Sequence, residues 1–324
     1  MKCWFLRAEA GRMVVDLRDA PVPTAGPGQV VVRVRAAALN RGEFIAGHGL
    51  HTAGGAKPAG FEGAGEVVEV GEGVTAFHVG DRVMGRCEPA FAEFGCMVAD
   101  EVFPVPDGMS WEHAASATVA CGTVHDALIG QGQLRAGEWV LVTGIASGVG
   151  VAALQVAKAL GARVIGTSGS ADKLARLQAM GLDIALHTRA PDFVPAVLEA
   201  TGGRGVDIAA NTVGGSLFPA LVESLAFEGR LATIGYVDGQ VHAGIDLAAL
   251  HKKRLRLYGV SNKMRTVAHR VEAARAFARD VLPLLADGGV VPVVDEVFAF
   301  DALPRAQQRM EENAHLGKLV VRMD

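Results

Sequence analysis

A glycine-rich turn between an apolar strand and a helix is the part of the sequence best suited to bind a ligand. The strand leads into the letters Gly-Ile-Ala-Ser-Gly-Val-Gly at 144–150, and an apolar helical stretch follows. A helix that begins at such a turn directs its first backbone N–H groups at a pyrophosphate. We therefore predict that Ser147, Gly148, Val149 and Gly150 bind a dinucleotide. The alternative is that these small residues serve close packing alone.

The next strand after this turn ends without an acidic residue. It covers 163–166 and is followed by Thr-Ser-Gly-Ser at 167–170, with Lys173 just beyond. An acid here would bind the ribose 2′-hydroxyl of NAD, whereas hydroxyls and a cation suit the 2′-phosphate of NADP. We therefore predict NADPH as the cofactor, with Ser168 and Lys173 on the 2′-phosphate. The alternative for Lys173 is a solvated helix face.

Length and composition limit the class of protein. A chain of 324 residues suggests two domains, and 50% hydrophobic residues with 41 glycines indicate a turn-rich globular protein. The net charge of −4 and a pI near 6.2 provide no basic field for nucleic acid or an anionic membrane. No apolar run reaches the roughly 18 residues of a membrane span, and the N-terminal residues become charged too early for a signal peptide.

The cysteines indicate a reducing compartment. Cys3, Cys87, Cys96 and Cys121 are widely spaced, which is typical neither of a disulfide framework nor of a zinc ribbon. We expect free thiols in a cytoplasmic protein that has no nucleic-acid or membrane partner.

Two regions with different element patterns divide the chain. The first 105 residues contain short strands and frequent glycines, for example at 29–35 and 65–71, which predicts a small barrel or sandwich. From about residue 137, strands and helices alternate, which is typical of a doubly wound parallel sheet. The expected strands are 138–143, 163–167, 183–187, 206–210, 230–235 and 255–260, and the helices between them include 170–180 and 215–226.

The C-terminal part is expected to return to the first region. A long helical pattern covers 264–286, and it is followed by a strand, a short helix capped by Asp301, and a final strand over 318–322. The predicted domains are a β-rich catalytic and substrate domain of residues 1–122 and 264–324, and a dinucleotide-binding domain of residues 123–263.

Further motifs are spread over both regions. They are Ala-Ala-Leu-Asn at 37–40, Gly-Phe-Glu-Gly-Ala-Gly at 60–65, Gly-Asp-Arg-Val at 80–83, Gly-Thr at 122–123 and the stretch 137–158. Together they resemble the medium-chain dehydrogenase/reductase superfamily, in its zinc-independent quinone-oxidoreductase branch, over essentially the whole chain. The resemblance implies an α/β fold in which a GroES-like β-rich catalytic domain accompanies a Rossmann domain.

Two substitutions at the family's metal positions predict chemistry without a metal. Zinc alcohol dehydrogenases of the superfamily carry Gly-His-Glu where this chain has Gly60-Phe61-Glu62, and a cysteine where it has Asn40. Phenylalanine cannot ligate a metal, and asparagine is a poor zinc ligand. Without a Lewis acid, hydride addition to a quinone or an α,β-unsaturated carbonyl is easier than alcohol oxidation, because the charge moves to a remote oxygen that a hydrogen bond can hold.

The resemblance also implies two catalytic residues, both of which are expected to contact the cofactor. Asn40 would hydrogen-bond the substrate carbonyl or the nicotinamide amide, and the alternative is a turn-forming asparagine. Thr123 would lie beside the cofactor, and the alternative is an N-cap for the helix that follows it.

The remaining predicted cofactor contacts lie near strand ends. Asn211 stands where relatives often have aspartate, and Gly235 and Tyr236 follow a strand of the parallel sheet, where ligands gather. Lys318 resembles a C-terminal lysine that lies near the cofactor phosphates in the family, and the alternative is an edge-strand charge.

Three histidines have residue types that could serve a metal or a pocket. His48 and His51 lie in a glycine-rich stretch with no third ligand evident, so we expect them at the rim of the substrate cleft. His125 could line the pocket, but a core or surface position is the stronger interpretation.

The leading hypothesis is an NADPH-dependent reductase that transfers hydride to a quinone or an α,β-unsaturated carbonyl. The enzymatic alternative is an enoyl-thioester reductase, and Lys57 is the single cation between Arg41 and Arg82 that could receive a carrier's phosphates. The alternative of another class is a non-catalytic NADPH-binding protein, structural or RNA-binding. The strand at 255–260 would leave an open sheet edge, so we expect a homodimer across a two-fold axis, and the alternative is that Arg254 and Arg256 protect a lone edge.

Overall fold

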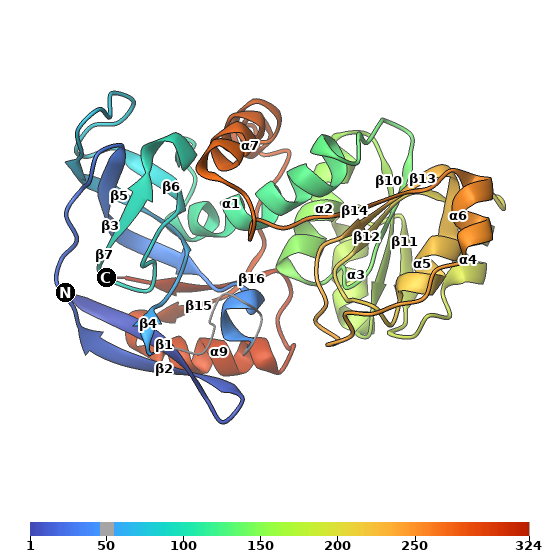
Figure 1. The fold of residues 1–324 in the computed structure, drawn as a ribbon, viewed down its shortest axis with the longest axis horizontal. Helices are drawn as coiled ribbons and strands as arrows, with labels where there is room; N and C mark the ends of the chain where they lie inside the picture. The colour runs from blue at the N-terminus through green and yellow to red at the C-terminus, as the bar shows by residue number, and fades with distance from the viewer. Residues whose placement is uncertain (46–54, 324) are drawn as a thin grey trace. The chain divides into compact units, whose positions relative to one another are not determined.

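Residues 1–45 and 55–323 are described by a computed structural model of the chain (Figure 1). The chain divides into unit 1, which comprises Met1–Val119 and Pro292–Asp324, and unit 2, which comprises Ala120–Val291. The chain therefore re-enters unit 1 at residue 292, whereas the sequence pattern predicted this return at residue 264. His48 and His51 lie outside the described residues.

The helix that follows residue 264 stays with unit 2 because a hydrogen bond and an ion pair hold it there. Asp280, at the end of α7 (Val267–Asp280), lies 2.9 Å from Nε2 of His125, and Arg265 pairs with Asp126 at 2.7 Å. His125 is therefore a buried, paired residue of unit 2, which agrees with the interpretation of a core histidine.

Two predictions about the C-terminal helices are wrong. The pattern over 264–286 forms two helices, α7 and α8 (Leu282–Ala286), because the ring of Pro283 clashes with the carbonyl four residues earlier. The short helix α9 (Leu303–Glu311) is not capped by Asp301, which lies in the 3-10 turn before it.

Unit 1 is β-rich, as predicted, and the last strand of the chain is part of its main sheet. That sheet has the order β15-β16-β3-β5-β6-β8, with β7 paired to β3, and a smaller sheet has the order β2-β1-β4. The strands are β1 (Lys2–Glu9), β2 (Arg12–Asp19), β3 (Gln29–Ala38), β4 (Lys57–Pro58), β5 (Glu62–Val70), β6 (Arg82–Arg86), β7 (Phe94–Val98), β8 (Val102–Pro104), β15 (Val294–Ala299) and β16 (Lys318–Arg322). The helical segments, apart from α9, are η1 (Arg41–Phe44), η2 (Ala99–Glu101), η4 (Phe300–Ala302) and α1 (Trp111–Val124), which continues into unit 2.

Unit 2 is a doubly wound sheet with the strand order β11-β10-β9-β12-β13-β14, and every neighbouring pair is parallel. The strands are β9 (Trp139–Val142), β10 (Arg163–Ser168), β11 (Ile184–His187), β12 (Val206–Asn211), β13 (Leu225–Thr233) and β14 (Arg256–Gly259). The helices, apart from α7 and α8, are the π-helix η3 (His125–Gly130), α2 (Gly148–Ala159), α3 (Ala171–Ala179), α4 (Val194–Ala200), α5 (Phe218–Ser224) and α6 (Leu247–Lys253). In Figure 1, α2 and α3 lie on one side of these strands, and α4, α5 and α6 lie on the other. The predicted doubly wound parallel sheet of a Rossmann domain is therefore confirmed.

The central strands of unit 2 consist mainly of apolar residues because helices cover both faces of the sheet. Leu141, Ile165, Ala209 and Leu231 are all fully buried and belong to one core cluster. A strand that is buried on both faces has no polar alternation, which is why the sequence shows continuous apolar runs here.

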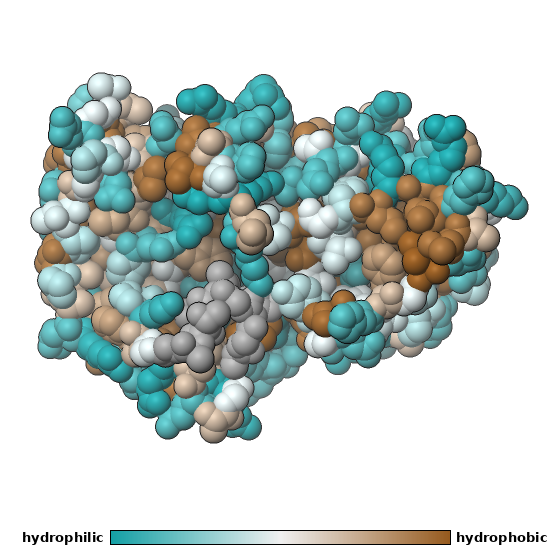
Figure 2. Space-filling model, in the orientation of Figure 1, coloured by the Kyte–Doolittle hydropathy of each residue, from teal (hydrophilic) through white to brown (hydrophobic). Residues whose placement is uncertain are grey.

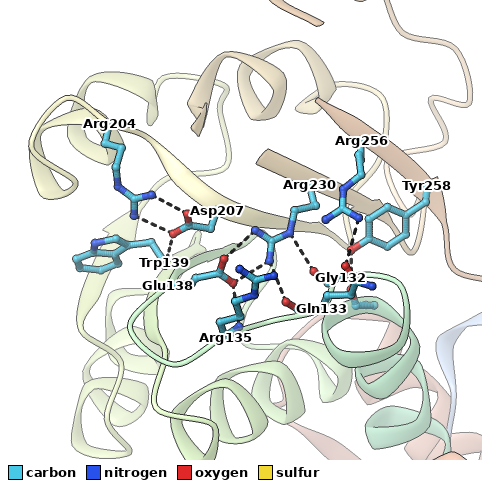
Figure 3. A network of polar contacts seen from close by, with 11 residues as sticks. Gly132, Gln133, Arg135, Glu138, Trp139, Arg204, Asp207, Arg230, Arg256 and Tyr258 are labelled. Carbon is cyan, nitrogen blue, oxygen red and sulfur yellow. Dashed lines mark hydrogen bonds and ion pairs between the residues drawn. The ribbon is translucent and has the colours of Figure 1, made fainter. Parts of the chain in front are cut away.

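A polar network ties together the amino ends of these strands (Figure 3). Arg230, which is 6% exposed, donates to both carboxylate oxygens of Glu138 at 3.0 and 2.7 Å and to the carbonyl oxygens of Gly132 and Gln133 at 2.9 and 3.3 Å. The guanidinium therefore joins β13 to the loop before β9. This end of the sheet is stabilised by internal pairing.

We expect Arg230→Met to lower the free energy of unfolding by about 3–5 kcal/mol, because Glu138 and two carbonyls would lose their partner inside the protein. Urea unfolding followed by circular dichroism measures the change. The matched control is Arg254→Ala, which breaks an exposed ion pair with Glu228 and should cost less than about 1 kcal/mol. Equal losses in the two variants would contradict a structural role for the buried network.

Candidate functional site

The predicted cofactor residues of unit 2 gather at one edge of its sheet. Because the strands are parallel, their carboxyl ends meet there, and this carboxyl edge is where ligands bind in doubly wound folds. Ser147, Ser168, Asn211 and Gly235 directly end or closely follow β9, β10, β12 and β13. The structure therefore brings the predicted residues of four different strand ends to the same edge.

The glycine turn places the N-terminus of α2 at this edge. Ser147 is the N-cap, and its Oγ accepts from the Gly150 N–H at 3.1 Å, which leaves the first-turn N–H groups of Gly148 and Val149 for a ligand. A Cβ on Gly150 would lie 2.6 Å from the backbone of Ile145. Gly150 is therefore required for close packing as well, so the packing interpretation also applies at this position.

The turn after β10 carries the predicted 2′-phosphate residues. The hydroxyl of Ser168 accepts from the Ser170 N–H at 3.3 Å, and the hydroxyl of Ser170 caps α3 by accepting from the Lys173 N–H at 3.4 Å. Ser168 and Lys173 are both half-buried at this turn. Arg189 was not predicted, and its side chain lies against Gly169 although it is distant along the chain.

Asn211 supports the carboxyl edge through its side chain. Its Oδ1 accepts from the N–H groups of Val213 and Gly214 at 3.1 and 3.0 Å, and its Nδ2 donates to the Gly214 carbonyl at 2.9 Å. An ionised aspartate cannot make the last bond, because it has no donor. The departure from the family's usual aspartate therefore has a local physical reason, and the side chain shapes the turn after β12.

Tyr236 and Thr123 have different surroundings. Tyr236 follows β13, and its hydroxyl lies 3.2 Å from Nζ of Lys263, whose charge also lies over the ring. Gly235 N–H donates to the Asn211 carbonyl at 3.2 Å. Thr123 lies in the last turns of α1 and does not begin a helix, so the N-cap alternative for Thr123 is wrong.

In unit 1, strand register brings together three residues that are far apart in the sequence. β16 pairs antiparallel with β3, and β3 pairs antiparallel with β5. Lys318 at the start of β16, Asn40 just after β3 and Glu62 at the start of β5 therefore meet at one end of the sheet. The family resemblance predicted that Asn40 and Lys318 contact the cofactor. The pairing of Lys318 with Glu62 was not predicted.

Glu62 is the centre of this polar cluster. Its carboxylate is fully buried and accepts from Lys318 Nζ at 2.9 Å and Asn40 Nδ2 at 3.1 Å. It also accepts from the Thr118 hydroxyl at 3.2 Å and the Val119 N–H at 2.6 Å, both in α1. The Lys318 ammonium is buried and forms an ion pair with this carboxylate. Its strand β16 lies between β15 and β3, inside the sheet, so the edge-strand alternative for Lys318 is wrong.

The Asn40 amide is oriented by its neighbours. Lys318 Nζ donates to its Oδ1 at 2.7 Å, while its Nδ2 donates to Glu62 and to the Ala38 carbonyl at 3.3 Å. Both N–H donors are therefore engaged, and one lone pair of Oδ1 is left for a further donor. Its side chain caps no helix, although it precedes η1, so the turn-forming alternative has no support from a cap bond.

A second buried carboxyl, Glu43 in η1, lies near the cluster and was not predicted. It is 2% exposed, and its Oε1 has no hydrogen-bond partner among the described residues. Burial raises the pKa of Glu43 to about 8, although the charge of Lys318 and hydrogen bonds to Asn40 act in the opposite direction. The Glu43 carboxyl therefore carries a proton at neutral pH. The nearby Lys318 ammonium does not prevent this, because it is paired with the Glu62 carboxylate.

The described ranges contain neither a metal cluster nor a membrane-spanning helix. Within 1–45 and 55–323, no three His, Cys, Asp or Glu side chains gather as a metal ion would require. No helix in these ranges combines the length and apolar character that a bilayer crossing needs.

Glu43→Gln should flatten the dependence of stability on pH. The native protein keeps the Glu43 proton from about pH 4.5 to 8 while the unfolded chain has lost it, so stability falls as pH rises through this window. The slope contributed by one group is at most about 1.4 kcal/mol per pH unit. Thermal and urea unfolding between pH 5 and 9 measure it, with Glu72→Gln as an exposed control. A slope that is the same in Glu43→Gln and wild type would contradict this assignment.

Comparison with known proteins connects both units to one family. The family profile described as alcohol dehydrogenase GroES-like domain matches residues 26–115, and the profile described as zinc-binding dehydrogenase matches residues 148–292. The quinone oxidoreductase of Pseudomonas aeruginosa is 31% identical, with 97% of each chain covered.

Two further similarities extend this relationship. The structure of Escherichia coli quinone oxidoreductase complexed with NADPH has a TM-score of 0.87 at 26% identity and covers 99% of this chain and 100% of that one. The mycocerosic acid synthase-like polyketide synthase of Mycolicibacterium smegmatis is 33% identical over 92% of this chain, which spans 14% of that synthase. The chain belongs to the medium-chain dehydrogenase/reductase superfamily, in its quinone-oxidoreductase branch.

Proposed function

We propose that the protein is an NADPH-dependent reductase that transfers hydride to a quinone or an α,β-unsaturated carbonyl compound. The observation that carries the proposal is the turn after β10, where Ser168 and Lys173 stand in place of a ribose-binding acid, beside the N-terminus of α2 at the same carboxyl edge. The similarity to a quinone oxidoreductase solved with NADPH supports the same cofactor. When bound, NADPH supplies the hydride.

The residues of the unit 1 cluster position Asn40. Because both Nδ2 hydrogens are engaged, Asn40 is better suited to accept a hydrogen bond from the nicotinamide carboxamide than to donate one to a substrate carbonyl. Lys318 and Glu62 hold the amide in this orientation. Thr123 is the second proposed contact to the cofactor, and solvent supplies the proton that the reduced product needs.

An enoyl-thioester reductase is the second candidate, since one segment of a polyketide synthase matches 92% of this chain. Lys57, the single cation between Arg41 and Arg82, is little support for a site that must bind the phosphates of a carrier. The choice of acceptor therefore separates the two enzymatic candidates.

NADPH oxidation by the purified protein, followed by its absorbance, tests the proposal. We expect turnover with 1,4-benzoquinones or enones and a clear preference for NADPH over NADH. Activity should be unchanged after exhaustive chelation, because Phe61 and Asn40 stand at the positions that bind zinc in the family's zinc enzymes. Turnover confined to crotonyl thioesters would favour the second candidate. NADPH binding without turnover of any acceptor would favour a non-catalytic protein, and loss of stoichiometric zinc together with activity would refute metal independence.

We also propose a homodimer that forms across β14. This strand is the edge of the unit 2 sheet, as predicted, and Leu257 on it is 36% exposed. Figure 2 shows a hydrophobic area where Figure 1 labels α6 and β13, and Leu247 of α6 and Phe227 of β13 are among the exposed large hydrophobic residues. Two such edges related by a two-fold axis would cover each other. The cytoplasmic location stays a prediction.

Leu257→Pro should shift the protein from dimer to monomer at micromolar concentration, because proline removes an N–H donor from β14. Sedimentation velocity measures the change, and circular dichroism confirms that the variant folds. Leu17→Pro, on the exposed part of β2 in unit 1, serves as a control of the same type and should leave the association state unchanged. A wild-type monomer, or a folded Leu257→Pro variant that remains a dimer, would contradict the proposed interface.

A further inference from the structure

The turn after β10 contains a glycine whose side-chain space is occupied by an arginine. Gly169 lies between Ser168 and Ser170, and a Cβ built on it would lie 2.8 Å from Cγ and Cδ of Arg189 and in steric conflict with Nε. The arginine stem therefore runs across the surface of Gly169. Gly169 does not have a left-handed φ, so its backbone conformation would accept an alanine, but the added methyl group would force the arginine stem to move away.

The backbone that carries Arg189 is held beside this turn. β10 and β11 pair in parallel with Ser168 opposite His187, so Arg189, two residues later, emerges at the same carboxyl edge. The following turn is fixed by Thr188, whose hydroxyl donates to Asp192 at 2.6 Å and accepts from the Ala190 N–H at 2.9 Å. The position of Arg189 is therefore defined by strand pairing and by a hydrogen-bonded turn.

The guanidinium has no counter-ion among the described residues. Arg189 is exposed and, within that part of the chain, has no hydrogen-bond or ion-pair partner. Lys173 and the N-terminus of α3 add positive potential at the same turn. Two acids belong to the neighbouring segments: Asp192 accepts a hydrogen bond from the Thr188 hydroxyl, and Asp172 lies in the first turn of α3. A guanidinium whose stem packs on Gly169, and which pairs with no acid among the described residues, is suited to receive an anion from outside.

We infer that Arg189, supported by Gly169, binds the 2′-phosphate of NADPH at the end of β10 and sets the discrimination against NADH. This inference rests on the proposed cofactor. A planar guanidinium donates two parallel hydrogen bonds to phosphate oxygens, whereas the Lys173 ammonium acts as a point charge. Arg189 is therefore the directional partner and Lys173 the supporting one, and Gly169 is a positioning residue that keeps the guanidinium in reach.

Calorimetric titration of the full chain with NADPH, NADH, 2′,5′-ADP and 5′-AMP tests this assignment. We expect Arg189→Ala to weaken NADPH and 2′,5′-ADP about 10-fold to 100-fold and to change NADH and 5′-AMP less than about 2-fold. Gly169→Ala should reproduce this loss, because its methyl group displaces the arginine stem, and the double variant should bind no more weakly than Arg189→Ala. Lys173→Ala should show a smaller loss with the same ligand selectivity.

Arg163→Ala is the matched control, since it removes the same charge at the opposite end of β10 and should leave all four affinities unchanged. If wild type prefers NADPH and Arg189→Ala keeps that preference, the inference is overturned while the proposed cofactor stands. If wild type binds NADPH and NADH equally, the proposed cofactor itself fails. If Arg189→Ala loses NADPH but a folded Gly169→Ala variant does not, the positioning role of Gly169 is refuted.

Discussion

The unit 1 site depends on the hydrogen bonds and the ion pair that the buried Glu62 carboxylate accepts. It accepts hydrogen bonds from the Asn40 amide just after β3 and from the Lys318 ammonium at the start of β16. It also accepts from a hydroxyl and a backbone N–H of α1. Removing one partner of a buried ion pair costs more than the pair contributes, because the remaining charge is left without solvation. Glu62 therefore stabilises an arrangement that also fixes which atoms Asn40 can offer to a ligand.

Much of the fold could be predicted because periodicity and turn residues carry local information. The apolar stretches of unit 2 and the turn residues between them predicted its six strands in the correct order along the chain, and the apolar character is strongest in the central strands, which are buried on both faces. Errors occurred where a local signal was ambiguous. The long helix was divided by Pro283, and the tail re-enters unit 1 later than predicted because Asp280 pairs with His125, a contact between residues 155 positions apart that leaves no local pattern.

The same distinction separates the predicted and unpredicted parts of the site. The glycine turn and the missing acid after β10 are legible in sequence because one short loop contains each of them. The pairing of Lys318 with Glu62, the proton on Glu43 and the contact of Arg189 with Gly169 depend on strand register and burial, which the sequence does not state. Asn211 lies between these cases: its position was predicted, but the structure explains why an amide serves there.

The position of β16 has a consequence for biosynthesis. Unit 2 is formed by one uninterrupted segment, so its sheet can assemble as soon as residue 291 has left the ribosome. Unit 1 cannot do so, because β16 pairs with β3 inside the main sheet and supplies the ammonium for Glu62. During synthesis the N-terminal strands keep an open edge and an uncompensated carboxylate until Lys318, 256 positions after Glu62, has been added. The N-terminal strands of the nascent chain therefore expose an unpaired edge, on which another chain can pair, until the last strand has been made.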